Sequence, residues 1–221
     1  MTAIDTVPFL GLPHATITLA SVSVTRQNIL RAAGVDFNVA PTAIDEARVR
    51  ADAQADEMAV DEIAVLLAFL KAQTASQILL PTQSSTESSY IIGCDQLLLI
   101  DDHIMAKPES LVEAKQQLLM LAGKHHELLS AIVLIRNGQR IWHYLGCAAL
   151  TMRKFDDVFA DAYIRRVGEA ALWSPGAYQI ESVGSSLFAR IDGDHFDILG
   201  LPLLPLLGIL HEHGLRPLEP V

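Results

Sequence analysis

Two long apolar runs joined by the dipeptide Asn137-Gly138 constrain the fold of this chain more than any other feature. The runs cover residues 126–135 and 140–151. Asn-Gly is the most favourable sequence for a two-residue turn between antiparallel strands, because both residues tolerate positive φ angles. The two runs should therefore pair as a long β-hairpin, and the rest of the fold must accommodate it.

Helix and strand patterns alternate on both sides of this hairpin. Short apolar runs predict strands, and apolar residues spaced three and four apart predict helices. Further strands are predicted at residues 16–20, 90–92, 97–100, 177–181 and 186–191, and helices before Gly34, at residues 54–75, from Ser110 to Gly123, at residues 156–167 and after Pro202. Because hairpins interrupt the alternation, we expect an α/β fold with a mixed central sheet.

The composition is that of one large domain or of two closely joined lobes. The chain has 221 residues, 51% of them hydrophobic, which is enough to bury a sizeable core. Its net charge of -10 offers no general attraction to nucleic acid or to an anionic membrane. The first 15 residues contain no Lys or Arg, and the apolar run at residues 198–210 is too short to span a bilayer. We therefore expect a cytoplasmic protein without nucleic-acid or membrane partners.

The segment between the first strand and the first helix could bind phosphate. It lacks the G-x-x-x-x-G-K-[ST] and G-x-G-x-x-G patterns of common nucleotide sites. However, Ser21, Ser23 and Thr25 offer hydroxyl groups at a helix N-terminus, and Arg26 offers a fixed positive charge. Taken alone, the stretch is explained more simply as an ordinary N-cap followed by a solvated arginine.

Asp95 is the acidic residue that is hardest to explain as a surface group. It lies in an apolar stretch, where a carboxylate must be hydrogen-bonded, paired with a cation or bound to a metal. We expect the strand to stop at Gly93 to Gln96 and then to resume, so that Asp95 belongs either to a structural turn or to half of a metal-phosphate site. Asp45 and Glu46 follow another strand-like segment and offer either hard oxygen ligands for Mg²⁺ or a surface turn.

Two lysines could supply positive charge. Lys71 falls at the edge of an apolar helical stripe and near the expected end of its helix, where a lysine often only interacts with the helix dipole. Lys107 precedes Pro108 at the start of the next helix. That start is well defined, because Ser110 and Glu113 form the Ser-x-x-Glu pattern of a capping box.

The cysteines and histidines form no recognisable site. Cys94 and Cys147 are too few for a disulfide framework, and we interpret Cys94 as a buried packing residue rather than a nucleophile. The histidines at residues 125–126 and 211–213 lack the spacing of the H-E-x-x-H zinc motif, so we interpret them as structural.

The order of several short motifs resembles that of the Maf-like nucleoside triphosphate pyrophosphatases. The motifs are LASVSVTRQNIL, DE at 45 and 46, LLAFLKA, IIGCDQ, AKP, GAYQIESVGSSLF and IDGDHFDILGLPLLPL, and they run from about Ile17 to Leu210. Two departures are visible. Val24 and Thr25 stand where the family usually has a proline and an arginine, and Ala106 stands where it usually has a glycine.

The resemblance implies a long, curved mixed sheet with flanking helices and two lobes around a nucleotide cleft. It implies one domain at residues 16–214, with an N-terminal extension at 1–15 and a tail at 215–221, often as a homodimer. It also implies metal-dependent hydrolysis of a nucleoside triphosphate to the monophosphate and pyrophosphate. Glu46 and Asp95 would hold Mg²⁺ or Mn²⁺, and Asp95 would accept a proton from the attacking water. The phosphate groups would be bound by Ser21, Ser23, Arg26, Lys71 and Lys107.

Three positions sort substrates by base in the resembled family, and here they are Thr25, Gln96 and Glu181. Gln and Glu resemble the branch that acts on 7-methyl-GTP, although Thr25 stands where that branch has a tryptophan, whereas the dTTP and UTP branch has Arg, Thr and Gln. A carboxylate only accepts hydrogen bonds, so Glu181 could take both donors of a guanine edge. We expect a modified purine nucleotide such as 7-methyl-GTP. The alternatives are a dTTP or UTP pyrophosphatase, a non-catalytic nucleotide-binding regulator of cell division, and a Cys94-dependent hydrolase.

Overall fold

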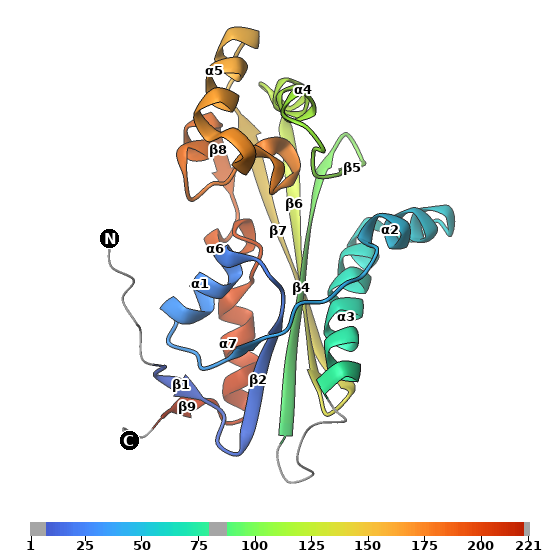
Figure 1. Cartoon of the computed structure of the whole chain (residues 1–221), viewed down its shortest axis with the longest axis vertical. Coiled ribbons are helices and arrows are strands. Elements are labelled where there is room, and N and C mark those ends of the chain that lie inside the picture. Colours follow the sequence, from blue (N-terminus) through green and yellow to red (C-terminus); the bar gives the residue numbers. More distant parts are fainter. Residues whose placement is uncertain (1–7, 80–87, 219–221) are drawn as a thin grey trace. The chain divides into compact units, whose positions relative to one another are not determined.

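The computed structural model describes residues 8–79 and 88–218 of the chain (Figure 1). The chain divides into two compact units, and neither is continuous in sequence. Unit 1 contains the residues up to Asp95, Ser130–Leu145 and the residues from Gly200 on, whereas unit 2 contains Gln96–Leu129 and Gly146–Leu199. The chain therefore passes between the two units four times.

Unit 1 is built on β2 (Ala15–Ala20) and the first part of β4 (Ser88–Ile100). These strands pair in parallel, with Ile17 opposite Tyr90. The unit also contains β1 (Leu10–Gly11), α1 (Val24–Ala32), β3 (Asn38–Val39), α2 (Glu46–Ala55), α3 (Val60–Leu79), α7 (Leu203–Glu212), β9 (Arg216–Pro217) and parts of β6 (His125–Arg136) and β7 (Gln139–Met152). Figure 1 shows α1 and α7 on one side of the two strands and α3 on the other, so both faces of the sheet are covered.

The helix α3 packs closely against β4 through small residues. Its buried face carries Ala64, Ala68, Ala72 and Ala75. A Cβ atom added to Gly93 of β4 would lie 2.1 Å from the backbone oxygen of Ala68. Only glycine therefore allows the helix and the strand to approach this closely.

The strand β4 is continuous from Ser88 to Ile100, so the expected break at residues 93–96 is wrong. Gly93 suggested a turn, but it is needed for the packing of α3 within an uninterrupted strand. Asp95 consequently lies inside a strand, with 4% of its surface exposed. Its presence there has to be explained by its neighbours and not by a turn.

The single helix expected at residues 54–75 is also wrong. Two helices, α2 and α3, cover this region, and the chain turns between them at Glu57, which has a φ of 56°. Apolar periodicity predicted α3 but could not reveal this turn. Because α3 extends to Leu79, Lys71 lies in its middle and not near its last turn.

By length and composition, α3 is the one helix among residues 8–79 and 88–218 that could cross a membrane. Eight of its residues are buried within the protein, and Lys71 is one of them. The core helix of a folded domain satisfies the same test of length and composition, and the packing of α3 on β4 accounts for its apolar character.

Unit 2 contains the second part of β4 and a hydrophobic core covered by helices. It also contains β5 (His103–Met105), α4 (Leu111–Leu121), α5 (Asp157–Val167), the 3₁₀ helices η2 (Gly168–Leu172), η3 (Pro175–Ala177) and η4 (Val183–Leu187), β8 (Phe188–Asp192), α6 (His195–Ile198) and the remaining parts of β6 and β7. The core includes Leu98, Leu118 and Tyr163. Half of the predicted capping box is present: the Ser110 hydroxyl accepts a hydrogen bond from the Glu113 amide at 3.2 Å, whereas the Glu113 carboxylate accepts one from the Glu109 amide at 2.8 Å.

The strand predicted at residues 177–181 does not form. This segment instead connects η3 to η4, and Gly176 at its start has a φ of 73°. A Cβ atom on Gly184 would lie 2.4 Å from the carbonyl oxygen of Gln179, so the chain folds back on itself. Apolar residues such as Tyr178 are buried in the core without strand pairing, and their pattern was misread as that of a strand.

The expected mixed α/β architecture is confirmed. In the described part of the chain, the main sheet has seven strands in the order β3-β2-β4-β6-β7-β8, with β5 paired to β4. The predicted hairpin is formed by β6 (His125–Arg136) and β7 (Gln139–Met152), and both Asn137 and Gly138 between them have positive φ angles. The β2–β4 pair is parallel and the β7–β8 pair is antiparallel, as a mixed sheet requires.

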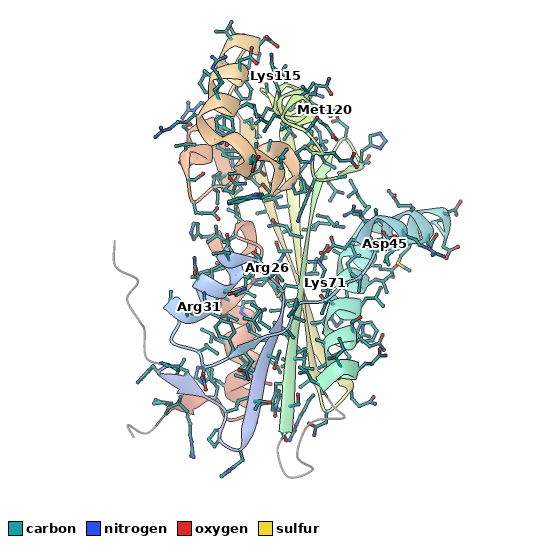
Figure 2. All side chains as sticks on the ribbon, viewed as in Figure 1. Arg26, Arg31, Asp45, Lys71, Lys115 and Met120 are labelled. Carbon is teal, nitrogen blue, oxygen red and sulfur yellow. The ribbon has the colours of Figure 1, made fainter. Side chains whose placement is uncertain are left out.

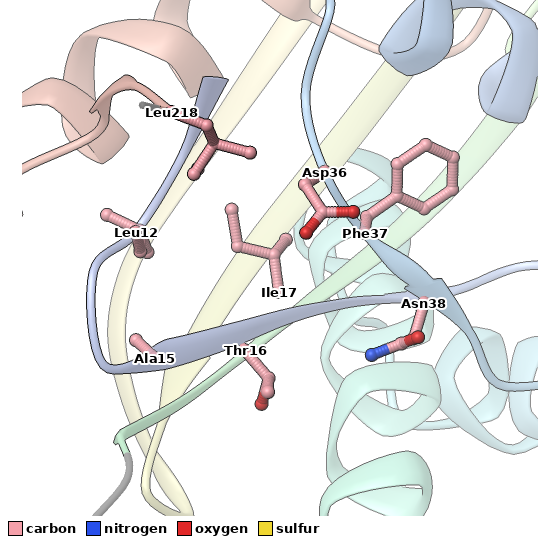
Figure 3. Close-up of a pocket in the computed structure, with 9 residues that line it drawn as sticks. Leu12, Ala15, Thr16, Ile17, Asp36, Phe37, Asn38 and Leu218 are labelled. Atoms are coloured by element: carbon pink, nitrogen blue, oxygen red, sulfur yellow. The ribbon is translucent and has the colours of Figure 1, made fainter. Parts of the chain in front are cut away.

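The short strands β1 and β9 pair antiparallel within unit 1, with Leu10 opposite Pro217. A pocket of about 100 Å³ lies beside them (Figure 3). It is lined by the start of β2, by residues 36–38 and by Leu218. None of the residues predicted to bind nucleotide or metal lines this pocket.

Candidate active site

The loop after β2 is organised around Arg26 of α1, which Figure 2 labels. Ser23 is the N-cap of α1 and accepts a hydrogen bond from the Arg26 amide at 3.4 Å, and the Ser21 hydroxyl accepts one from the Ser23 amide at 3.3 Å. The Arg26 guanidinium donates through Nε to the Gly200 carbonyl at 2.7 Å. Its Nη1 donates to the Cys94 carbonyl at 3.2 Å and to Ser21 Oγ at 3.3 Å. The N-cap exists as expected, but the arginine is held in place and is not simply solvated.

This arrangement suits an anionic ligand. A guanidinium fixed beside the N-terminus of a helix adds its charge to the backbone amides and the helix dipole, which all favour phosphate. The first turn of α1 contains no acidic residue to oppose this, and Thr25 is half-buried within it. The loop therefore has the chemistry of a phosphate site without the sequence of a common one.

Lys71 links two carboxylates into a cluster, which we call the carboxylate cluster (Glu46, Lys71 and Asp95). Its Nζ lies 2.8 Å from Glu46 Oε1 and 2.5 Å from Asp95 Oδ1. Glu46 begins α2, Lys71 is central in α3 and Asp95 belongs to β4, so three elements converge here. Asp45 lies outside the cluster, because its carboxylate caps α2 by accepting a hydrogen bond from the Arg48 amide at 3.0 Å.

Burial and neighbouring charges shift the acidity of Asp95. Burial raises the pKa of its carboxyl above the ordinary value, and Glu46 adds to this rise, whereas Lys71 opposes it. Its Oδ2 atom is buried and has no hydrogen-bond partner among the described residues. A buried carboxylate oxygen without a partner is costly unless a ligand, a water molecule or a cation binds it. A raised pKa also makes the carboxylate a stronger base than an ordinary aspartate.

The two carboxylates of the cluster fit a divalent cation. Mg²⁺ is commonly bound by one or two carboxylates and completes its shell with water and substrate phosphates. Asp95 Oδ2 is an oxygen atom of the right kind, and its burial makes an incoming cation favourable. Among residues 8–79 and 88–218, no group of three or more His, Cys, Asp and Glu side chains could hold a metal. The fit is therefore to a cation that shares its ligands with a phosphate, and not to a metal enclosed by protein.

Cys94 lacks the properties of a nucleophile. Its side chain is fully buried, and this burial raises the pKa of the thiol to about 11. A thiol that stays protonated at neutral pH reacts poorly, because the thiolate is the nucleophilic form. Both Cys94 and Cys147 are free cysteines. The structure supports Cys94 as a packing residue and argues against a hydrolase that depends on it.

Two of the histidines interpreted as structural have hydrogen-bond partners within the protein. In unit 2, His126 Nε2 lies 2.9 Å from the Tyr178 hydroxyl. In unit 1, His211 Nδ1 lies 2.9 Å from the Leu215 carbonyl oxygen. These contacts agree with a structural role for His126 and His211.

Unit 2 contains three more of the predicted site residues. Lys107 is exposed between β5 and α4, and Glu181 is exposed between η3 and η4. Gln96 donates through Nε2 to the carbonyl oxygens of Asp197 and Ile198, both at 3.0 Å. The donor side of the Gln96 amide therefore holds α6, which the sequence did not indicate.

Sequence reasoning missed a second buried acid, Asp197 in α6. Its surface is 5% exposed, and burial, followed by the charge of Asp194, raises the pKa of its carboxyl to about 6. It packs over Gly146 of β7, where an added Cβ atom would lie 2.2 Å from the Asp197 Cγ. The same rule that singled out Asp95, an acid among apolar neighbours, would have found it.

Comparisons with known proteins agree over nearly the whole chain. Residues 16–213 match the sequence model of a family described as Maf-like protein. A nucleoside triphosphate pyrophosphatase of Rhodospirillum rubrum is 42% identical over 198 residues, which is 90% of this chain and 95% of that protein. Two proteins named 7-methyl-GTP pyrophosphatase are also 42% identical. The one from Brucella abortus aligns with 88% of this chain and 94% of its own length, and the one from Rhizobium etli with 89% and 95%.

Proposed function

The chain belongs to the family of Maf-like proteins, and we propose that it is an enzyme that hydrolyses a nucleoside triphosphate to the monophosphate and pyrophosphate. The proposal is supported by relatives named nucleoside triphosphate pyrophosphatase and 7-methyl-GTP pyrophosphatase that match almost end to end. The observation that carries it in this chain is the carboxylate cluster, in which a buried aspartate with a raised pKa keeps one oxygen without a partner.

Asp95 is the proposed proton acceptor for the water that attacks the α-phosphorus. An ordinary aspartate is too weak a base for such a role, and the raised pKa of Asp95 makes its carboxylate more basic. Glu46 and Asp95 would hold Mg²⁺ or Mn²⁺, which would supply charge neutralisation and a more acidic water molecule. The phosphates would be bound by the hydroxyls and cations of Ser21, Ser23, Arg26, Lys71 and Lys107.

The proposed substrate is a modified purine nucleotide such as 7-methyl-GTP. Glu181 would accept hydrogen bonds from both donors of the guanine edge, whereas uracil and thymine offer one donor. Methylation at N7 makes the ring cationic and strengthens these bonds. Gln96 and Thr25 would complete the selection of the base. The amide donors of Gln96 hold α6, so it would contact the base through its side-chain oxygen.

We also propose that the enzyme acts in the cytoplasm on free nucleotides, without nucleic-acid or membrane partners, and that it is a homodimer. The net charge of -10 supports the first part, because it disfavours binding to polyanions outside a local cationic site. Analytical ultracentrifugation would measure the oligomeric state.

Pyrophosphate release from a panel of nucleotides in the presence of Mg²⁺ or Mn²⁺ tests the activity. We expect Asp95→Asn to lower kcat by a factor of about 100 or more, because general base catalysis typically contributes that much. Cys94→Ala is the matched control at the neighbouring residue and should retain activity, since its thiol is buried and protonated. Full activity of Asp95→Asn, or inactivation by Cys94→Ala, would overturn the assignment.

The same assay tests the base. Wild-type protein should have a higher kcat/KM for 7-methyl-GTP than for dTTP or UTP, and Glu181→Gln should reduce that ratio by roughly tenfold, because a good hydrogen bond to a charged group is worth that much or more. Faster turnover of dTTP or UTP by the wild-type protein would reject the proposed substrate.

A further inference from the structure

A single buried glutamine of α4 connects two segments of unit 2. Gln117 has 7% of its surface exposed. Its Nε2 donates to the carbonyl oxygen of Ala106 at 3.0 Å, and its Oε1 accepts a hydrogen bond from the amide of Gly176 at 2.9 Å. Nε2 also lies 3.4 Å from a carboxylate oxygen of Glu113, one helical turn away. Both ends of one side-chain amide are therefore used to hold the backbone.

The first of these segments ends in a proposed phosphate ligand. Ala106 immediately precedes Lys107, so its carbonyl group belongs to the peptide unit that begins Lys107. Lys107 is exposed on a segment that belongs to no helix or strand. The hydrogen bond from Gln117 fixes the orientation of this peptide from the buried side, and with it the direction in which Lys107 leaves the backbone.

The second segment leads to the proposed base contact. Gly176 adopts a φ of 73°, and an added Cβ atom would lie within 2.9 Å of side-chain atoms of Tyr178, Leu121 and Leu98, so this turn has little freedom. The turn is also closed by a hydrogen bond across Gly176, in which the Ser174 hydroxyl donates to the Tyr178 carbonyl at 2.6 Å. Gly176 is therefore a rigid start for the segment.

The rest of that segment is tied to itself. The side-chain Nε2 of Gln179 donates to Ser174 Oγ at 3.1 Å and to the Ala170 carbonyl at 2.7 Å. The Ser182 hydroxyl donates to the backbone carbonyl of Gln179 at 3.0 Å. Glu181 lies between Gln179 and Ser182 in this network. A shift at the start of the segment is thus expected to move Glu181 as part of one body.

We propose that Gln117 is a positioning residue that fixes Lys107 and Glu181 together, so that phosphate binding and base selection depend on the same buried amide. This inference rests on the proposed function, which gives Lys107 and Glu181 their roles. An apolar residue of similar size would fill the same space in the core but would leave the Ala106 carbonyl and the Gly176 amide without their partner.

The substitution Gln117→Leu tests the inference, with Gln116→Leu as the control. Gln116 is the exposed neighbour on the same helix, so the control repeats the chemical change without touching the two segments. For Gln117→Leu we expect KM to rise about tenfold for every nucleoside triphosphate and the kcat/KM ratio of 7-methyl-GTP to UTP to fall several-fold. Gln116→Leu should match the wild type within about twofold.

Loss of stability without loss of positioning gives a different result. If Gln117 only stabilises unit 2, Gln117→Leu will melt at a lower temperature while the folded enzyme keeps the wild-type KM and the wild-type base ratio. That result would overturn the inference. Rates are therefore measured at least 15 °C below the midpoint of thermal unfolding, which circular dichroism provides for each variant.

The conservative change Gln117→Glu adds a readout that packing alone would not move. The new carboxylate keeps an acceptor for the Gly176 amide but faces the Ala106 carbonyl without a hydrogen atom to donate. Protonation restores a donor, and burial with Glu113 nearby favours the protonated form. We expect the KM defect to shrink as the pH falls from 8 to 6, relative to the wild type over the same range. A defect that does not change with pH contradicts the proposed role.

The experiment separates failure of this inference from failure of the proposed function. If the wild-type protein releases no pyrophosphate from any nucleotide, the proposed function fails. Binding of non-hydrolysable triphosphate analogues, measured by calorimetry, then decides the inference. A dissociation constant raised about tenfold by Gln117→Leu and not by Gln116→Leu supports the positioning role, and equal constants reject it.

Discussion

Replacement of Lys71 by methionine should destabilise the protein strongly and in a pH-dependent way. Methionine is close to lysine in shape and keeps the packing in α3, so the change mainly removes the ammonium group. At the observed N–O separations of 2.5 and 2.8 Å, the attraction to each carboxylate is roughly 6 kcal/mol at an effective dielectric constant of 20. Desolvation offsets much of this. Removal of one partner of a buried ion pair typically costs about 3–5 kcal/mol, or roughly 10 °C in the melting temperature of a protein of this size.

The pH dependence follows from the carboxyl group left behind. Without Lys71, the largest influence that lowers the pKa of Asp95 is lost and only the charge of Arg26 still lowers it, so burial and Glu46 raise this pKa further. A group whose folded-state pKa lies above its unfolded value stabilises the fold below the unfolded pKa, and this contribution is lost as the pH rises through the folded pKa. The deficit of Lys71→Met should therefore be smallest near pH 4 and largest at pH 8.

Urea unfolding at pH 4, 6 and 8 measures this deficit. The double variant Lys71→Met with Asp95→Asn provides the control, because a neutral side chain needs no cation. It should recover about half or more of the lost stability at pH 8 and show little dependence on pH. An equal deficit at all three pH values, or no recovery by Asp95→Asn, would refute the argument that the buried charge sets the cost.

Three further substitutions, one of them a control, test the packing and the second buried acid. Gly93→Ala should destabilise the protein by about 3 kcal/mol, because the new methyl group meets the backbone of Ala68. Gly208→Ala in α7 should be neutral or stabilising, since nothing lies within 4 Å of the added atom, and similar urea midpoints for the two variants would contradict the packing argument. The pKa of Asp197 is raised to about 6, so its contribution to stability is present below about pH 4 and is lost as the pH rises to 6. The free energy of unfolding of the wild type should fall by about 1 to 3 kcal/mol over that interval because of this group, and Asp197→Asn should abolish that fall. If the melting temperature of Asp197→Asn still changes between pH 4 and 6 as steeply as that of the wild type, another group is responsible.

Elements with local signals could be predicted from the sequence. The hairpin at Asn137-Gly138 depends on the φ angles of two residues, and the start of α4 depends on Ser110 and Glu113 within one turn. Both are present in the structure. Such features carry their cause in neighbouring residues, so they can be recognised without knowledge of the fold.

The errors arose where a distant partner decides the conformation. Gly93 locally predicts the end of a strand, whereas the helix 20 or more residues earlier requires a glycine there within a continuous strand. The segment that contains Tyr178 was read as a strand, although its apolar residues fill a core without pairing. An apolar run in the sequence does not distinguish a strand from a buried segment without strand pairing, because the same residue types occur in both.

The candidate site was predictable in parts. Glu46, Lys71 and Asp95 were named through the resemblance of their motifs, and the structure brings them together through ion pairs. Gln117 could not have been named, because a glutamine in an amphipathic helix has no distinctive pattern. Its importance depends on two backbone groups, one 11 and one 59 residues away.

Because the two units are interleaved in sequence, one contact of the loop after β2 cannot form until late in synthesis. The carbonyl that accepts the hydrogen bond from Arg26 Nε belongs to Gly200, which is 174 residues further along the chain. A ribosome that adds about 5 to 20 residues per second needs roughly 9 to 35 s to reach it. Until then the loop with Ser21 and Ser23 has emerged without the residue that anchors its arginine. The Arg26 contact to Gly200 is therefore missing while most of unit 2 is translated, and the loop proposed to bind phosphate is complete only once the last segment of the chain has been made.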